Sequence, residues 1–309
     1  MHAQVQRRDS TNRFGHDSIQ RIPEVVSLFQ EVRKTLLSQS GVATAGGGGG
    51  AGGGGRAPGG LGAGAADRAG LMEEMAGKSK YLTAIREDTE RYREEIESLS
   101  AMVQAFRAGD MEGVCTFVEQ MDAALSILSD ENAVLKGFEW PEARVDALRE
   151  SSALYRENRA ALARIEGYAP GKDSWSVECT RMSKCFEDTE RLIQLRSRSA
   201  AADAKRFESH EIPWSGEADM AALTAATLTI AKCYMLTTAA EGGRMIQLSE
   251  EQQGNEAGFL KQAFAVLTNA IRFAFRVHQL THGFDRDCQE AFADIQRLHR
   301  LCTHRIDGA

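Results

Sequence analysis

Glycine and proline are scarce in this 309-residue chain outside one segment. Fifteen of the 29 glycines fall between Gly41 and Gly70, and there are only five prolines. Aromatic residues make up 7% of the chain. Much of the sequence instead consists of Ala, Leu, Glu, Arg, Met and Gln, which cost an α-helix least. This composition argues against a β-rich architecture and predicts an all-α fold.

The chain also lacks a surplus of basic residues. Its formal net charge is −7, and the stretch from Ala108 to Glu142 alone holds eight acidic residues against one lysine. Proteins bind nucleic acid through Lys and Arg side chains that displace counterions from phosphates. The sequence therefore predicts no nucleic-acid partner.

Cysteine pairs and a secretory segment are missing as well. Six cysteines are spread along the chain without a C-x-x-C motif, and no basic and then apolar segment opens the sequence. We therefore expect reduced thiols and a cytoplasmic location.

One long apolar run needs to be tested as a membrane span. The run from Met220 to Ala240 has about the required length of 20 residues, but it is rich in Ala and Thr and contains Lys232. We predict a buried core helix and no membrane span in this chain, with a span as the less favoured alternative.

Composition divides the chain into three parts. In the N-terminal segment, residues 1–40, the stretch from Arg21 to Gln39 is predicted to be an amphipathic helix with Pro23 in its first turn. Residues 41–70 form a glycine-rich linker, which we expect to be a flexible tether. Residues 71–309 are expected to form a helical domain.

The clearest periodic signal runs from Leu71 to Phe106. Ten positions follow one another in steps of three and four residues, and eight of them are apolar or aromatic. This spacing predicts one long helix of roughly 36 residues, about 54 Å, with a coiled-coil-like seam. The seam can either pack within the fold or form a dimer.

Six further helices are predicted, with boundaries at proline or glycine residues. Apolar residues on two faces of the fifth of them indicate a central, largely buried helix, and the Thr281-His282-Gly283 sequence after it predicts a glycine cap. The six helices are Glu112–Leu128, Pro141–Ile165, Asp173–Phe207, Met220–Gln247, Gln253–Leu280 and Asp285–His304.

The sequence contains no recognisable catalytic motif, neither a G-x-S-x-G elbow nor a local cysteine signature. His278 and His282 have the spacing of metal ligands on a helix, but histidine is also favoured in the last turn of a helix. We expect a capping or packing role for them, and no enzyme, metal or cofactor. A helical-bundle enzyme that uses His278, His282 or Cys288 is the alternative.

Three stretches carry a family resemblance: Val134–Glu142 (VLKGFEWPE), Ile271–Gln279 (IRFAFRVHQ) and Arg21–Val26 (RIPEVV). In content, order and spacing they resemble the C-terminal region of the plant chloroplast unusual positioning protein family. The likeness covers nearly all of the chain from Arg21 to Ile295 except the glycine-rich linker.

This resemblance implies an elongated, multi-helix domain similar to the formin homology 2 domain, and a function in nucleating or binding actin filaments during chloroplast positioning and anchoring. It implies actin as a partner, a homodimer, and a cytoplasmic location at the cytosolic face of the chloroplast outer envelope. Full-length relatives also carry an envelope anchor and a proline-rich segment that recruits profilin. We expect these elements to lie outside this chain, which is then either a fragment or a short form.

There are two alternatives to this actin hypothesis. Related plant proteins act on microtubules, so a microtubule-associated helical scaffold is the first. The second is a helical-bundle protein of another function.

The candidate contact residues lie in or beside the shared stretches: Lys136, Phe138, Trp140, Pro141, Arg272, Arg276 and Phe284. The first four precede a helix, where an aromatic anchor beside a charge can form an interface hot spot, or a Trp-Pro corner can fill the core. Phe284 has the same two roles open to it. The arginines can meet the acidic surface of actin or pair internally with the stretch from Asp110 to Glu142.

Overall fold

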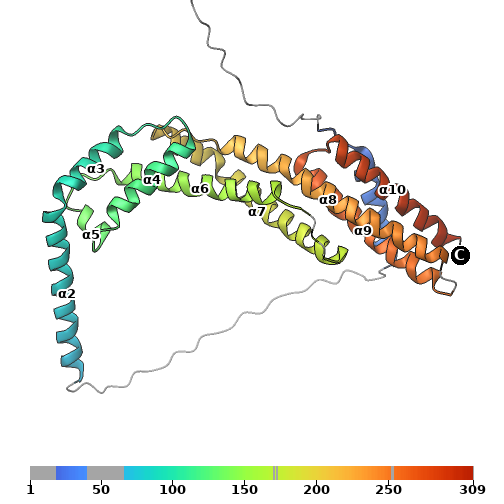
Figure 1. The fold of residues 1–309 in the computed structure, drawn as a ribbon, viewed down its shortest axis with the longest axis horizontal. Coiled ribbons are helices and arrows are strands. Elements are labelled where there is room, and N and C mark those ends of the chain that lie inside the picture. Colours follow the sequence, from blue (N-terminus) through green and yellow to red (C-terminus); the bar gives the residue numbers. More distant parts are fainter. Residues whose placement is uncertain (1–18, 40–65, 170, 172, 252–253, 309) are drawn as a thin grey trace, which may run out of the picture. The chain divides into compact units, whose positions relative to one another are not determined.

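The computed structural model describes residues 19–39, 66–169, 171, 173–251 and 254–308. Within these residues the chain forms ten α-helices, and the only β-type pairing is an isolated bridge between Gln20 and Phe284 (Figure 1). This confirms the predicted all-α fold. Most of the predicted glycine-rich linker, residues 41–65, lies outside the described residues. The helices are α1 (Pro23–Gln39), α2 (Ala66–Arg91), α3 (Arg93–Ala105), α4 (Met111–Leu125), α5 (Glu131–Leu135), α6 (Glu142–Glu166), α7 (Trp175–Ser209), α8 (Gly216–Glu251), α9 (Glu256–Thr281) and α10 (Arg286–Asp307).

The described residues separate into two compact units, each with its own hydrophobic cluster. Unit 1 combines the described parts of Met1–Gly41, Glu157–Ala200 and Glu217–Ala309. Unit 2 combines those of Val42–Arg156 and Ala201–Gly216. The boundaries between the units therefore fall within α6 and α7 and at the start of α8.

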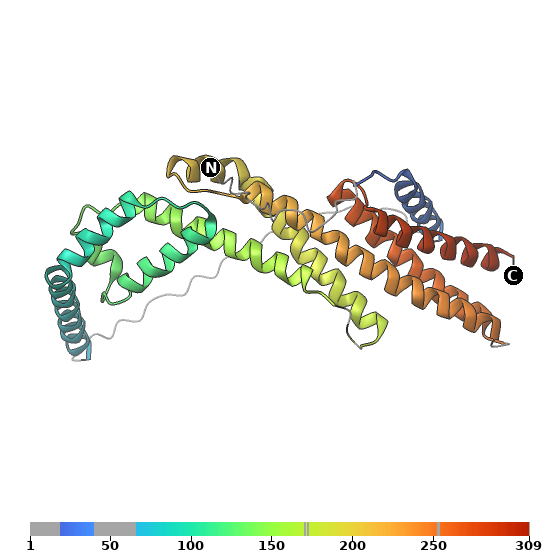
Figure 2. The same ribbon diagram turned by 45° about the horizontal axis from the view of Figure 1, so that its top comes forward.

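Helix α9 lies at the centre of unit 1. Its buried residues include Leu260, Leu267 and Ile271 on one face and Val266 and Phe273 on another. This confirms the prediction of a central, largely buried helix, which follows from apolar residues on two faces. Helices α10 and α1 pack against α9 (Figure 1, Figure 2).

Helix α1 forms as the sequence predicts, because Pro23 suits its first turn and its apolar residues share one face. Val25, Leu28 and Val32 are buried in the unit 1 cluster. The ring of Phe29 also stacks on that of Phe275 in α9, with 3.9 Å between the ring centroids. Hydrophobic burial thus attaches α1 to α9 of the same chain.

The end of α9 differs from the predicted glycine cap. His282, with φ of 57°, takes the left-handed conformation that ends the helix. Gly283 lies beside the bridge that follows, in which the backbones of Gln20 and Phe284 exchange two hydrogen bonds of 2.9 Å. A Cβ atom at Gly283 would collide with the backbone of Gln20, so glycine is needed here for the close approach of two backbone segments.

Helix α8 is, among the described residues, the one helix long and apolar enough to cross a membrane by length and composition. The same two properties are found in core helices, so they are weak evidence for a span. Leu223, Ile230 and Met235 of α8 are fully buried in the unit 1 cluster. This is the packing expected of the predicted core helix.

Unit 2 is built from α2 to α5, the first part of α6 and the end of α7. Its cluster includes Val114, Met121, Leu148 and Phe207. Helices α4 and α5 begin with Asp110 and Asp130, whose carboxylates accept hydrogen bonds from the backbone N–H groups three residues later. These aspartates are typical N-caps and explain where both helices start.

The predicted single helix from Leu71 to Phe106 is wrong, because the structure divides it at Tyr92 into α2 and α3. The Tyr92 N–H still donates to the Asp88 carbonyl, so the chain bends there without a loop. Ile96 and Leu99 of the predicted seam are buried in unit 2, whereas Leu82 is 58% exposed. The α3 part of the seam and Ile85 near the end of α2 pack against the unit 2 cluster, whereas Leu82 does not.

Candidate protein-contact site

The turn between α5 and α6 holds four of the predicted contact residues, Lys136 to Pro141. Lys136 is exposed, and the rings of Phe138 and Trp140 are half-buried against the unit 2 cluster. The Arg93 guanidinium lies over the Phe138 ring, 5.6 Å from its centroid. Each ring therefore has one part in the core and another at the surface, which suits an anchored contact turn as well as a corner of the core.

Helix α3 holds the backbone of this turn in place. The Ser100 hydroxyl donates a 3.0 Å hydrogen bond to the Glu139 carbonyl, and the Phe138 N–H donates to the Leu135 carbonyl at the end of α5. Because the middle of the turn is tied to both α3 and α5, the exposed Lys136 side chain projects from a fixed backbone.

Arg276 pairs within unit 1, with a different partner from the predicted one. Its guanidinium donates to Glu190 at 2.7 Å and to Glu187 at 3.2 Å, and lies over the Phe186 ring. All three partners belong to α7. The predicted pairing of Arg276 with the acidic stretch Asp110–Glu142 is therefore wrong, because α9 packs beside an acidic face of α7. Arg272 is exposed and makes no ion pair with any described residue.

Phe284, a predicted contact residue, is fully buried in unit 1. Its ring lies edge-on to that of His278 and near that of Phe292. Its backbone forms the bridge to Gln20. The structure thus gives Phe284 a core role, since a partner protein at this surface does not reach the ring.

His278 anchors the chain just before α1. Its Nε2 atom accepts a hydrogen bond of 3.1 Å from the Ile22 N–H. Burial lowers the pKa of His278, and the charge of Arg21 lowers it further, so the neutral acceptor form is favoured. In the described parts of the chain no three His, Cys, Asp or Glu residues come together as a metal site would require.

Cys288, one of the three residues suggested for the alternative enzyme, is fully buried. Its Sγ lies 3.3 Å from the Leu228 carbonyl. Burial raises the pKa of the Cys288 thiol, and the negative charge of Asp285 raises it further. A thiol with a raised pKa and no exposure is a poor nucleophile, which argues against this alternative.

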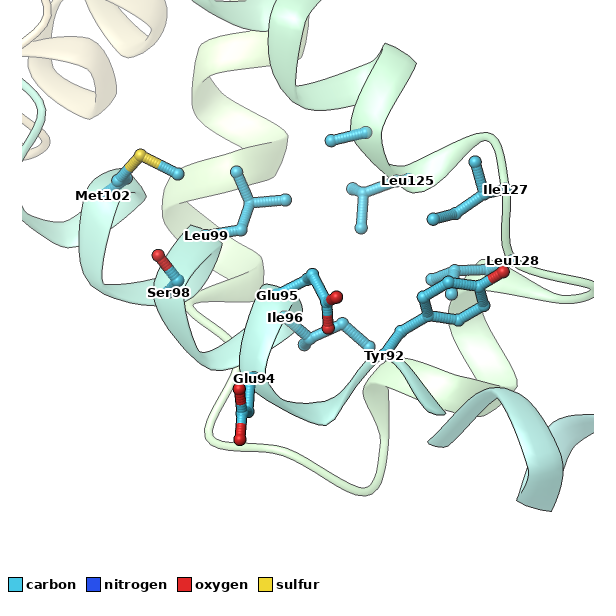
Figure 3. Close-up of a pocket in the computed structure, with 11 residues that line it drawn as sticks. Tyr92, Glu94, Glu95, Ile96, Ser98, Leu99, Met102, Leu125, Ile127 and Leu128 are labelled. Atoms are coloured by element: carbon cyan, nitrogen blue, oxygen red, sulfur yellow. The ribbon is translucent and has the colours of Figure 1, made fainter. Parts of the chain in front are cut away.

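An apolar groove between α3 and α4 is a feature of unit 2 that the sequence analysis missed. Figure 3 shows Leu99 of α3 and Leu125 of α4 on facing sides of it, with Met102 toward one end and Tyr92 toward the other. The groove encloses about 430 Å³. Met102 is 51% exposed and Ile127 is 55% exposed, so two large exposed apolar side chains line one groove.

A sequence signal for this groove exists only in retrospect. Met102 lies between the seam positions Leu99 and Val103, and Ile127 follows the end of α4. Met102 is outside the buried stripe of α3 and Ile127 is outside any helix, but a single exposed apolar residue is common on protein surfaces. Only the folded α3–α4 pair shows that the two lie at one groove.

Comparison with known proteins places the chain in a family. Residues 148–307 match the family model described as IPGAL1-like, C-terminal domain. An uncharacterized protein of Arabidopsis thaliana is 26% identical over 229 residues, which are 71% of this chain and 30% of that protein. The chain therefore spans less than a third of the length of this relative. The family model matches more than half of the residues of this chain. The chain therefore belongs to the plant family of IPGAL1-like proteins through their C-terminal domain.

Proposed function

We propose that this chain is a non-enzymatic, dimeric helical domain that binds actin and promotes filament assembly during chloroplast positioning and anchoring. The observation that carries the proposal is the turn at residues 136–141. It forms the centre of Val134–Glu142, one of the two nine-residue stretches that resemble the chloroplast unusual positioning family, and it combines the exposed Lys136 with the half-buried rings of Phe138 and Trp140.

The chemistry of this turn suits a contact with a protein surface. Interface hot spots are rich in aromatic residues that are anchored in their own protein and desolvated by the partner. Lys136 is a positive charge beside them that can pair with an acidic group of actin within the contact. Nucleation would follow if the two turns of a homodimer hold two actin monomers in a filament-like arrangement, because the entropy of bringing the monomers together is then paid in advance.

The proposal also includes a location in the cell, which would be determined by an anchor and a recruiting segment outside the matched region. The relative in Arabidopsis is more than three times as long as the matched region. The proposed position is the cytosolic face of the chloroplast outer envelope, with the membrane anchor and the profilin-recruiting, proline-rich segment supplied by other parts of the protein or by a partner.

The test is the assembly of labelled actin with and without the purified chain, alongside the mass of the chain from light scattering. We expect a shortened lag phase from a dimer. Lys136→Glu should raise the concentration of chain needed for the same lag by about tenfold, since it reverses a charge at the contact. Lys205→Glu is the matched control, because Lys205 is also an exposed lysine of unit 2, and it should leave the lag unchanged.

Two results would overturn the proposal. One is an unchanged lag from a folded monomer. The other is sedimentation of the chain with microtubules but not with actin filaments, which would favour the microtubule-associated scaffold that related plant proteins suggest.

A further inference from the structure

The negative charge of this protein is concentrated in one of its two units. Residues 66–156 and 201–216, the described part of unit 2, hold 22 acidic and 13 basic side chains and thus a net charge of −9. Residues 19–39, 157–200 and 217–308, which span the described part of unit 1, hold 20 of each. A partner that depends on charge therefore meets an attractive surface on unit 2 if it is basic.

The α3–α4 groove is the apolar opening in this acidic unit. Ile96, Leu99 and Leu125 are buried within it, and Met102 and Ile127 are more than half exposed. Exposed apolar groups that line a common depression on a charged surface are typical of an interaction site, because a partner that covers them removes apolar surface from water. Met102 adds adaptability, since methionine adjusts its shape to different partners.

Two glutamates at the groove keep their charge available to a partner. Glu94 and Glu95 lie in the first turn of α3 and line the groove (Figure 3). Both are exposed, and neither forms an ion pair with any residue that the structure describes. In contrast, Asp122 of α4 is paired with Arg149 at 2.7 Å. The groove thus combines an apolar interior with an edge of unpaired negative charge.

We propose that the α3–α4 groove is a docking site for a basic amphipathic helix of a partner protein. The apolar face of the helix, with residues at positions i, i+3 or i+4, and i+7, would cover Leu99, Met102 and Ile127. Lys and Arg beside that face would lie near Glu94 and Glu95. This site is separate from the Lys136 turn, so it extends the proposed function and does not depend on actin.

Charge selects this occupant over others. Nucleic acid and anionic lipid are repelled by the net charge of unit 2. A second copy of the chain is the remaining competitor, because α2 presents the exposed Leu82 between Lys78 and Arg86 on one face. Among the residues of that face whose side chains the structure describes, Leu82 is the one large exposed apolar residue. A helix in a groove uses several, so a separate partner is the better fit.

The experiment measures fluorescence anisotropy of a labelled 18-residue peptide of Leu and Lys, with the leucines on one helical face, against the full chain. We expect saturable binding that weakens with salt. The same peptide with its residues shuffled to remove the apolar face, and the version with Glu in place of Lys, should each bind at least tenfold more weakly.

Variants of exposed residues separate the groove from the acidic surface in general. Met102→Asp and Ile127→Asp should each weaken peptide binding by tenfold or more, because they introduce a charge at the apolar contact. Leu195→Asp is the matched control, since Leu195 is 54% exposed in unit 1, and it should change the affinity by less than twofold. Unchanged circular dichroism of all three variants shows that they remain folded.

Three outcomes contradict the proposal. The first is equal binding of the shuffled peptide, which would mean attraction to acidic charge alone. The second is unaltered affinity in Met102→Asp and Ile127→Asp. The third is a mass that rises with protein concentration and falls in Met102→Asp, which would make the groove a contact between two copies. Failure of the actin assay affects none of these measurements, so the two proposals are tested separately.

Discussion

The contacts of two buried histidines in unit 1 require the neutral form of the imidazole. His278 accepts a hydrogen bond from the Ile22 N–H. His299 of α10 packs against the Phe264 ring, and its Nε2 lies 3.4 Å from the Thr268 hydroxyl of α9. Burial lowers the pKa of both, and lowers that of His299 to about 4. A proton on either ring would place a charge in the core.

Lowering the pH should therefore destabilise the protein through His299. An unfolded histidine has a pKa near 6.5, so between about pH 6.5 and pH 4 the unfolded chain binds a proton that the folded chain does not. The contribution of neutral His299 to the stability of the folded state is complete above pH 6.5 and is lost as the pH falls toward 4. Between pH 7 and pH 5 the loss from His299 should be about 2 kcal/mol.

The measurement is urea unfolding at pH 7 and pH 5 for the native chain and for His299→Gln. The variant should lose about 2 kcal/mol less between the two pH values. His304→Gln is the control, since His304 is an exposed histidine on the same helix. If the free energy of unfolding changes equally with pH in the native chain and in His299→Gln, the loss does not come from His299.

At the scale of the elements, Arg144 of α6 ties together the ends of two other helices. Its guanidinium donates to the carbonyls of Val103 and Phe106 at the end of α3, at 2.9 and 2.7 Å. A third hydrogen bond of 2.7 Å reaches the His210 carbonyl just after α7. The last carbonyls of a helix lack partners within it. Arg144 supplies a partner to the Val103 and His210 carbonyls, while the Phe106 carbonyl also accepts from Arg107.

Arg144→Met should lower the free energy of unfolding by about 2–3 kcal/mol, because it removes three hydrogen bonds from a charged donor and leaves half-buried carbonyls unsatisfied. The midpoint of urea unfolding, followed by tryptophan fluorescence, reports the change. Arg159→Met on the same helix is exposed and should stay within about 0.5 kcal/mol of the native chain. A native midpoint for Arg144→Met would show that water replaces the arginine without cost.

At the scale of the whole molecule, the protein has two hydrophobic cores. One cluster includes Leu267 and Phe186, and the other includes Met121 and Leu148. Each unit assembles segments that are far apart in the sequence. Separate cores are the physical basis for separate cooperative units, since each buries its own apolar surface.

Calorimetry of the full chain should therefore show two unfolding transitions. Met121→Ala should lower the temperature of one of them by about 10 °C, and Leu267→Ala should lower the other by a similar amount, since a large-to-small change in a core costs 2–5 kcal/mol. A single transition that moves with both variants would show that the two cores unfold together.

The sequence by itself determined the helices. Composition and apolar periodicity act over one or a few turns, so they predicted the all-α fold, the amphipathic α1 and the doubly apolar α9. They also located most helix ends to within a few residues, because proline, glycine and capping residues act on their immediate neighbours. The short helix α5 was missed, since five residues contain too little of a helical period.

Tertiary structure decided what each side chain meets. The pairing of Arg276 with α7 and the burial of Phe284 both follow from residues distant in the sequence. The α3–α4 groove does too, because Met102 and Ile127 lie 25 positions apart and become neighbours at one depression only when the two helices pack. Local patterns specify which face of a helix is apolar, but the identity of the partner across that face depends on the packing of the complete chain.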